Sequence, residues 1–414
     1  MIAPSAVLVV AAASFTGGVP LTIVGTSDLH GRIERLPVLA ADVAAIRAEL
    51  KKAGGAVIYV DGGDLFQGTL ESNMVEGKSV IDGMNLIKPD AVAVGNHEFD
   101  YGPVGPLVIA HAPGDDPRGA LKARAKDAQF PFLAANVIDE ATGKPPSYMK
   151  GSVLVSAAST KVGIIGLTTM DTPHTTTASN FKGLKVIAQK DAVLGEVDAL
   201  KKAGATVIVV VGHLGGACKD LSNPTDLSSC EKDSEVFNLA NALPAGVVDV
   251  IVAGHTHNQI ANVVNGIPII ESWANGRGFG RVDLDVDSKT HKATLVKVHA
   301  PQDLCKDDKA AACAPSDVDG APITADAKVQ AAEQPYLDTA GKEKMKKLGV
   351  VVKHEMKRGY DVESALGNMF ADAMLEAAHD QGWKADVAVI NGGGIRTNLK
   401  SGELTYGEVY EMMP

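Results

Sequence analysis

The chain has 414 residues, enough for more than one domain, because single hydrophobic cores rarely grow beyond about 250–300 residues. Apolar residues make up 45% and aromatic residues only 4%, while the 43 glycines suit a globular α/β protein built from small side chains. The net charge of −11 argues against a nucleic acid polymer as partner. It does not exclude a small anionic substrate, since bound divalent cations would invert the local field.

The first 20 residues resemble a secretory signal, because an apolar segment at 6–13 is followed by small residues. No Lys or Arg precedes this segment, and a disordered leader is the alternative interpretation. The segment is too short to span a bilayer, and no later stretch is long enough for a transmembrane helix. We therefore expect an extracytoplasmic protein, either periplasmic or secreted.

Four cysteines permit three disulfide pairings. Two local pairs, Cys218 with Cys230 and Cys305 with Cys313, are the simplest choice, because each pair brackets a short polar loop. A metal site is the rival interpretation, but the Cys-x-x-Cys spacing typical of zinc is missing. Disulfides also favour a compartment outside the cytoplasm.

From residue 21 the pattern of strand, loop and helix repeats. A strand at 21–24 precedes a helix over 37–52, whose apolar residues recur at helical spacing. A second helix is predicted around 78–86. Further strands are predicted at 56–60, 91–94, 162–167, 206–211, 248–252 and 267–270. Segments 282–286 and 294–298 alternate in polarity and predict an antiparallel pair that closes the domain.

The remaining chain predicts a surface excursion at 301–322, a charged helix over 325–347 and a second unit from about Leu348. A helix of that unit carries four apolar residues on one face: Leu366, Met369, Phe370 and Met374. The apolar run 387–390 predicts a strand that leads into a glycine-rich turn. The expected organisation is a leader (1–20), a first domain (21–322), a linker helix (323–347) and a partial second domain (348–414).

Metal-capable side chains follow the strands of the first unit. In chain order they are Asp28, His30, Asp64, Asn96, His97, His213, His255 and His257. A lone Gly-His turn is usually only a polar loop, but five such turns in order indicate a site at the carboxyl ends of the strands. Mixed Asp, Asn and His ligation suits Zn²⁺, Mn²⁺, Fe²⁺ or Co²⁺. The two oxygens of Asp64 could bridge two ions, the arrangement used for phosphoester hydrolysis.

The hexapeptide 95–100, Gly-Asn-His-Glu-Phe-Asp, follows the strand at 91–94. Asn96 can offer a neutral oxygen to a metal ion. His97 can give or hold a proton near neutral pH, and Asp100 lies close enough in sequence to orient its ring. Glu98 and Phe99 have no evident chemical role, so we expect them to support packing or the loop.

These motifs together resemble the calcineurin-like metallophosphoesterase signature, carried by Asp28-x-His30, Gly63-Asp64, residues 95–98, Gly212-His213 and residues 254–257. Segments 61–69 and 96–102 resemble, more narrowly, the bacterial and ecto-5′-nucleotidase family, and 391–396 resembles its C-terminal domain. The resemblance covers residues 21–414. It implies an α/β fold, namely a four-layer αββα sandwich followed by an α/β substrate domain.

The resemblance also implies two divalent ions, one held by Asp28, His30, Asp64 and His257, the other by Asp64, Asn96, His213 and His255. A metal-bound water would attack the phosphorus atom. His97 would contact the phosphate and stabilise charge on the leaving oxygen, with Asp100 fixing its tautomer. The substrate would be contacted by Asn391, Gly393, Gly394 and Arg396.

The chain departs from the family pattern in two places. An arginine usually precedes the segment at 363–368, where this chain has Asp361-Val362 and places Arg358 earlier. The family pattern also continues past residue 414, so the second domain is expected to be partial.

The predicted function is hydrolysis of nucleoside 5′-monophosphates. One alternative is hydrolysis of nucleotide diphosphate-sugars or 2′,3′-cyclic nucleotides at the same site. Another is a non-catalytic nucleotide-binding surface protein. The partner would be a small nucleotide or other phosphoester, and no oligomeric state is predicted.

Overall fold

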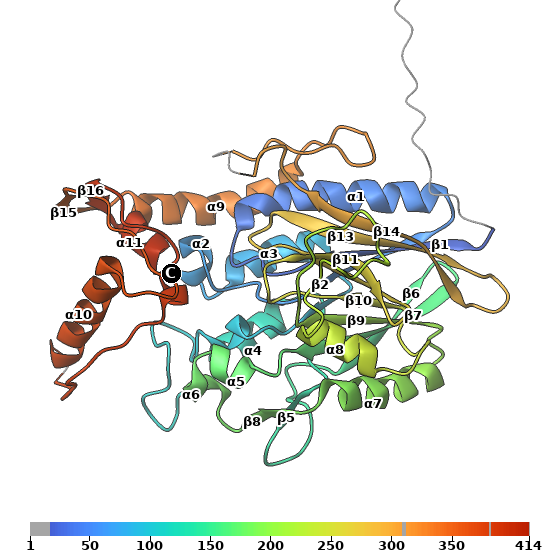
Figure 1. The fold of residues 1–414 in the computed structure, drawn as a ribbon, viewed down its shortest axis with the longest axis horizontal. Coiled ribbons are helices and arrows are strands. Elements are labelled where there is room, and N and C mark those ends of the chain that lie inside the picture. Colours follow the sequence, from blue (N-terminus) through green and yellow to red (C-terminus); the bar gives the residue numbers. More distant parts are fainter. Residues whose placement is uncertain (1–16, 309–311, 381, 414) are drawn as a thin grey trace, which may run out of the picture.

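The computed structural model describes residues 17–308, 312–380 and 382–413, so most of the signal-like leader at 1–20 lies outside the described residues. Two six-stranded sheets lie face to face between layers of helices, and a smaller unit follows at the C-terminal end (Figure 1). This is the predicted αββα sandwich. In the described part of the chain, no helix is both long and apolar enough to cross a membrane.

The first sheet has the strand order β14-β13-β1-β2-β3-β4. Its strands are β1 (Val19–Thr26), β2 (Ala56–Asp61), β3 (Ala91–Ala93), β4 (Phe132–Leu133), β13 (Gly278–Val286) and β14 (Ala293–Asp303). Strands β1 to β4 run parallel, and β13 and β14 form the predicted antiparallel pair. Residues 301–303, predicted to begin the surface excursion, instead extend β14, where Gln302 pairs with Phe279.

The second sheet has the order β11-β12-β10-β9-β7-β6. Its strands are β6 (Ser152–Ala157), β7 (Thr160–Thr168), β9 (Val207–His213), β10 (Val250–Val252), β11 (Gln259–Val264) and β12 (Ile267–Ser272). The four central strands β12, β10, β9 and β7 are parallel, while β11 and β6 pair antiparallel at the two edges. A separate pair joins β5 (Val137–Asp139) and β8 (Leu184–Val186).

The core lies in three apolar layers, because alternate residues of a strand face opposite sides of its sheet. In β9, Val209 and Val211 pack in the cluster between the two sheets, whereas Ile208 and Val210 pack in the cluster under the helices. Both faces are buried, so such strands appear in the sequence as continuous apolar runs.

Helices cover both outer faces of the sandwich. Against the first sheet lie α1 (Leu36–Lys52) and α3 (Lys78–Ile87), and against the second lie α7 (Gln189–Lys202) and α8 (Glu235–Ala242). Shorter helices occur in the connections: η1 (Ile33–Arg35), α2 (Leu70–Asn73), η2 (His97–Phe99), α4 (Gly119–Asp127), α5 (Thr172–Thr175) and α6 (Ala178–Phe181).

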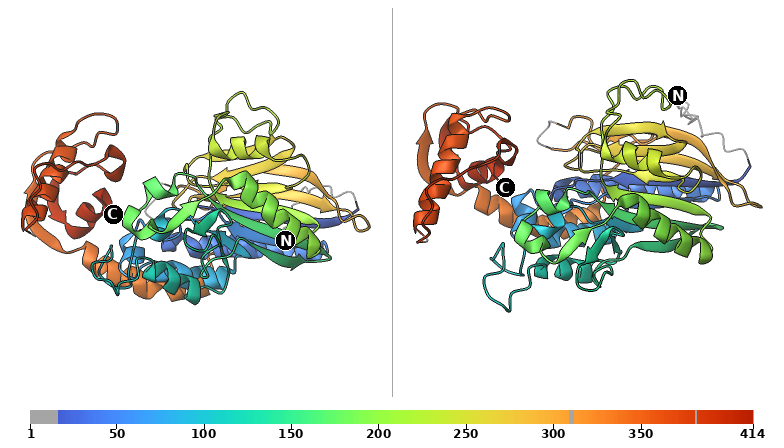
Figure 2. Two further views of the ribbon diagram at one scale, coloured as in Figure 1. Left: turned by 90° about the horizontal axis from the view of Figure 1, so that it is seen from below. Right: turned by 60° about the horizontal axis from the view of Figure 1, so that its bottom comes forward.

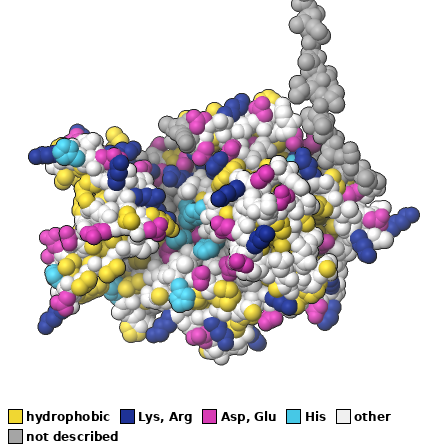
Figure 3. Space-filling model, viewed as in Figure 1, with side chains coloured by type: hydrophobic (Ala, Val, Ile, Leu, Met, Phe, Trp, Pro, Cys, Tyr) yellow, Lys and Arg dark blue, Asp and Glu magenta, His cyan; other side chains and the backbone are white. Residues whose placement is uncertain are grey.

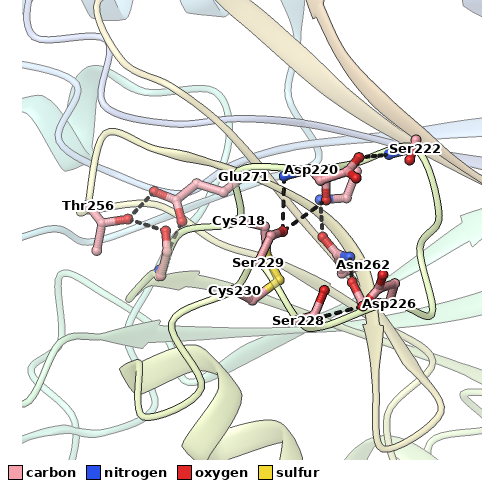
Figure 4. Close-up of a disulfide and its surroundings, with 12 residues drawn as sticks. Cys218, Asp220, Ser222, Asp226, Ser228, Ser229, Cys230, Thr256, Asn262 and Glu271 are labelled. Carbon is pink, nitrogen blue, oxygen red and sulfur yellow. Dashed lines mark hydrogen bonds between the residues drawn. A yellow bond between two sulfur atoms is a disulfide. The ribbon is translucent and has the colours of Figure 1, made fainter.

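Both predicted disulfides are present, Cys218–Cys230 and Cys305–Cys313. The first closes a polar loop beside the second sheet (Figure 4). In this loop the backbone N–H of Cys218 donates to the carbonyl of Gln259 at 3.0 Å. This loop therefore leaves the end of β9 and is tied to the start of β11.

Helix α9 (Ala327–Lys344) connects the sandwich to the C-terminal unit (Figure 2). It begins after Asp326, whose side chain accepts hydrogen bonds from the N–H groups of Lys328 and Val329. The unit contains β15 (Lys347–Val352), α10 (Ala365–Asp380), η3 (Gly392–Gly394), β16 (Gly402–Thr405) and α11 (Tyr406–Met412).

One expectation for this unit needs correction. The run 387–390 is not a strand: no described strand pairs with it, and the side chains of Val387 and Val389 remain 74% and 82% exposed. An apolar run becomes a strand only when a neighbour satisfies its backbone groups. On the apolar face of α10, Leu366 is buried, but Met369 and Met374 are exposed.

Candidate metal centre

The predicted ligands meet at the carboxyl edges of both sheets. From the first sheet, Asp28 and His30 follow β1, Asp64 follows β2 and Asn96 follows β3; from the second, His213 ends β9, and His255 and His257 follow β10. Figure 3 shows histidine side chains in a hollow between the sandwich and the C-terminal unit. Parallel strands that end at one edge bring residues distant in sequence together.

Asp28, His30 and His257 form a first ligand group, whose ligand atoms lie within 4.8 Å of one another. His257 Nε2 lies 3.0 Å from His30 Nε2 and 3.4 Å from Asp28 Oδ1. His30 Nδ1 donates to the carbonyl oxygen of Gln67 at 2.7 Å. Because that oxygen can only accept, the proton sits on Nδ1 and the lone pair of Nε2 faces the group.

Asp64, His213 and His255 form a second group of the same kind. His213 Nε2 lies 3.0 Å from Asp64 Oδ2, 3.1 Å from His255 Nδ1 and 3.0 Å from Asn96 Oδ1. His213 Nδ1 donates to the carbonyl of Gly62 at 2.9 Å, so its Nε2 is the atom available to a ligand. The amide oxygen of Asn96 thus lies beside this group.

The carboxylate of Asp64 lies between the two groups. Besides His213, its Oδ2 atom is 4.0 Å from His30 Nε2 and 4.0 Å from His97 Nε2. Imidazole nitrogens and carboxylate oxygens that face one another at these distances form a set of ligand atoms that could bind divalent cations. The residues therefore fit two ions of the borderline-hard class, with one shared carboxylate.

Burial and charge set the protonation of these groups. Burial lowers the pKa of His30 and of His255 to about 4, which leaves both as neutral imidazoles, the form that binds metal. Burial acts on His213 as well, but Asp64 outweighs it and raises the pKa to about 10. Burial alone would raise the pKa of Asp64, yet His213 and His97 hold it well below its usual value. A divalent ion bound here would take the place of the proton on His213.

Five of the predicted ligands have left-handed backbone conformations. The φ angles are 53° at Asp28, 49° at His30, 56° at Asp64, 78° at His255 and 57° at His257. This conformation costs about 1–2 kcal/mol for a residue with a Cβ. It is held by bonds between the loops, since the N–H groups of Asp28 and His30 donate to the carbonyls of Gly63 and Asp64 at 2.8 and 3.0 Å. These hydrogen bonds between the loops therefore help to hold the turns in place.

His97 and Asp100 form a pair beside the second group. His97 Nδ1 donates to Asp100 Oδ2, and the other carboxylate oxygen accepts from Thr176 Oγ1 at 2.7 Å. Burial would lower the pKa of His97, but Asp64 and Asp100 outweigh it and raise the pKa to about 9. The imidazolium form therefore predominates at neutral pH, with Nε2 directed toward Asp64.

Glu98 has the loop-supporting role expected for it. Its buried carboxylate accepts from the N–H groups of Gly95 at 2.6 Å, Asp64 at 2.9 Å and Leu65 at 2.7 Å. It therefore joins the turns that follow β2 and β3. Glu271 makes comparable bonds to the loops of the second sheet and was not predicted; its only signal was an acid within the apolar run of β12.

A cavity of about 590 Å³ connects the first ligand group to the C-terminal unit. The sandwich contributes His30, Arg32, residues 67–70, His257 and Asn275, and the following segment contributes Lys344, Arg358, Arg396, Thr397, Tyr410 and Glu411. Among the predicted substrate residues this lining includes Arg396, but not Asn391, Gly393 or Gly394. Arg358, too early by the family spacing, reaches the cavity and donates to the carbonyl of Ile395 at 2.8 Å.

A two-sheet sandwich with two aspartate–histidine groups at its carboxyl edge is the architecture of a metallophosphoesterase. Residues 21–259 match the calcineurin-like phosphoesterase family, and the chain belongs to that family. Residues 345–414 match the 5′-nucleotidase C-terminal domain. Members of this family are metal-dependent phosphoester hydrolases.

Individual relatives support the same assignment. The chain is 29% identical to the endonuclease YhcR of Bacillus subtilis across 96% of its own length, although it spans only 31% of that protein. It is 27% identical to a 5′-nucleotidase of Vibrio cholerae, covering 95% of this chain and 71% of the relative. The crystal structure of a 5′-nucleotidase precursor from Thermus thermophilus superposes with a TM-score of 0.68 at 25% identity, covering 95% of this chain and 74% of that one.

Proposed function

We propose that the protein hydrolyses nucleoside 5′-monophosphates to nucleoside and phosphate at a centre of two divalent ions. One observation carries the proposal: Asp64 Oδ2 of the second ligand group lies 4.0 Å from His30 Nε2 of the first, and His97 Nε2 lies 4.0 Å from the same oxygen. The ions would be Zn²⁺, Mn²⁺, Fe²⁺ or Co²⁺. Asp28, His30, Asp64 and His257 would hold one, and Asp64, Asn96, His213 and His255 the other.

The ions, when bound, supply Lewis acidity and lower the pKa of water toward neutrality. The protein contributes orientation and a proton donor. Asp100 fixes the ring of His97, so that its Nε2–H can donate to a phosphate oxygen and stabilise charge on the leaving oxygen. No side chain needs to act as a nucleophile.

The cavity supports a small nucleotide whose leaving group extends toward the C-terminal unit, where Arg396 would contact it. Asn391, Gly393 and Gly394 remain proposed substrate contacts, although they do not line this cavity. Its lining favours a second candidate as well. The lining contains one acidic side chain, that of Glu411, and four cationic side chains, those of Arg32, Lys344, Arg358 and Arg396. A nucleotide diphosphate derivative would place its second phosphate among these cations.

A substrate panel separates the two candidates. Turnover of a nucleoside monophosphate, a nucleotide diphosphate-sugar, a 2′,3′-cyclic nucleotide and p-nitrophenyl phosphate is compared with added Mn²⁺ or Zn²⁺. Highest kcat/KM on the monophosphate supports the leading proposal, and highest kcat/KM on the diphosphate derivative supports the second. Binding of two ions without hydrolysis of any phosphoester would instead identify a non-catalytic nucleotide-binding protein.

The role of His97 has its own test. His97→Ala should reduce kcat by about 100-fold or more, because it removes a proton donor, while the bound metal per chain stays unchanged. His111→Ala, at an exposed loop position, is the matched control and should behave like the unsubstituted protein. Equal loss of metal and of turnover in His97→Ala would contradict the role.

The two disulfides support a protein that works outside the cytoplasm, in the periplasm or as a secreted protein. The net charge of −11 favours small phosphoesters over nucleic acid polymers as substrates. Comparing hydrolysis of a mononucleotide with that of single-stranded DNA tests this preference, which faster cleavage of the polymer would refute.

A further inference from the structure

Glu271 is a buried acid in the strand β12, only 1% exposed. Its Oε1 atom accepts from Thr256 Oγ1 at 2.6 Å and from the N–H of Asn258 at 3.3 Å. Its Oε2 atom accepts from the N–H of Gly216 at 3.2 Å. Figure 4 shows the carboxylate of Glu271 directed toward Thr256 and away from the disulfide loop. Burying a carboxylate costs free energy unless hydrogen bonds replace those it made to water. These bonds therefore hold the side chain of Glu271 in one position.

The partners of Glu271 belong to the two histidine loops of the second sheet. Gly216 lies three residues after His213, and Thr256 separates His255 from His257. The two loops also touch directly, because the hydroxyl of Thr256 lies 2.8 Å from the carbonyl of Gly216. At Gly215 a Cβ atom would collide with the carbonyl of Gly254 and with the Glu271 carboxylate, so the loops pack at the closest distance that glycine permits.

We propose that Glu271 is a positioning residue that sets His213 against His255 and His257, and thereby sets the metal affinity of the centre. The first sheet has the same device in Glu98, which joins the turns after β2 and β3. At the edge of each sheet, a buried carboxylate thus fixes the positions of two loops that carry predicted ligands. The inference rests on the proposed function in one respect, namely that these histidines bind metal.

Glu271→Gln tests the proposal at nearly unchanged side-chain volume. Its amide NH₂ would face either the N–H of Gly216 or the donors at 256–258, so one loop loses its acceptor. We expect Mn²⁺ affinity to fall by about 10- to 100-fold, the usual effect of losing a partner that orients a metal ligand. Mn²⁺ binding to chelator-treated protein is measured by calorimetry, and kcat is measured against Mn²⁺ concentration. Saturating Mn²⁺ should restore most of kcat.

Glu235→Gln is the matched control. Glu235 also accepts three hydrogen bonds, from Thr169 Oγ1, the N–H of Met170 and Gln189 Nε2, each at 2.8 Å. It supports a loop that carries no predicted ligand, so this variant should lose thermal stability without losing Mn²⁺ affinity.

A second pair of variants keeps the test decisive if Glu271→Gln does not fold. Thr256→Val removes the hydroxyl that bonds to Glu271 and should lower Mn²⁺ affinity, whereas Thr256→Ser retains it and should restore the affinity. Unchanged Mn²⁺ affinity in Glu271→Gln or in Thr256→Val would overturn the inference, as would an equal loss in Glu235→Gln. If the unsubstituted protein bound none of Mn²⁺, Zn²⁺, Fe²⁺ and Co²⁺, the proposed function would fail and the inference with it.

Discussion

Replacing Glu333 by glutamine should stabilise the protein at neutral and alkaline pH. Glu333 lies on α9 and is fully buried against α3, where Gly83 leaves space for its carboxyl group. Neither carboxyl oxygen accepts a hydrogen bond from any described residue. Burial, reinforced by the nearby Glu34, raises the pKa of Glu333 to about 9. The side chain is therefore a neutral acid in the folded protein at pH 7.

The size of the effect follows from proton linkage. In an unfolded chain this carboxyl group has its ordinary pKa of 4.5, whereas the folded protein keeps the proton up to about pH 9. Between these values the unfolded state binds fewer protons, so the free energy of unfolding falls as pH rises. At about 1.4 kcal/mol per pH unit, the loss reaches about 3 kcal/mol at pH 7. Because glutamine cannot ionise, the Glu333→Gln variant should not lose this part of its free energy of unfolding as pH rises.

The assay is the melting temperature of both proteins measured from pH 5 to pH 9. The advantage of Glu333→Gln should be smallest at pH 5 and should grow with pH. Asp338→Asn, at an exposed position on the same helix, controls for the loss of one acidic group from α9. A difference that is the same at every pH, or a lower melting temperature of Glu333→Gln at pH 8, would refute the reasoning.

Two further predictions concern the centre and its surroundings. Asp100→Asn should lower the pKa of His97 from about 9, so that the imidazolium loses its proton at a lower pH. The value of kcat at pH 8 should then fall by about 10- to 100-fold while the metal content stays unchanged. A pH–rate profile measures this change, and a profile whose decline at alkaline pH does not move would contradict the prediction. Replacing both Cys218 and Cys230 by serine should reduce the free energy of unfolding by about 3 kcal/mol, since the bridge closes a loop with a sequence separation of 12. Thermal or urea unfolding tests this, and an unchanged midpoint would argue that the loop is ordered without the bridge.

The sandwich, and the meeting of the metal-capable side chains at its edge, could be predicted from sequence because their signals are local. A strand buried on both faces is a continuous apolar run, as at 207–211 in β9, and the polar residue that ends it marks the carboxyl edge of the sheet. His213 occupies that position, and the other ligands follow strands in the same way. Convergence then follows from parallel topology alone.

Other features depend on contacts that no local pattern encodes. Glu271 acquires its role from Gly216 and Thr256, which are distant from it in the chain. The run 387–390 satisfies the same apolar rule as β9, yet it lacks a described neighbour and is not a strand. Arg358 reaches the cavity through the path of its loop, which residue spacing does not reveal.

Each ligand group takes side chains from both sheets. Asp28 and His30 come from the first sheet and His257 from the second, while Asp64 from the first meets His213 and His255 from the second. An ion bound in either group would therefore cross-link the two halves of the sandwich at their carboxyl edge. Ions that bind only the folded state raise its stability by mass action, so the melting temperature should rise with metal concentration. Hydrogen exchange at the ends of β1 and β9 should slow in parallel. The cohesion of the sandwich and the proposed chemistry at its edge would then depend on the same six side chains.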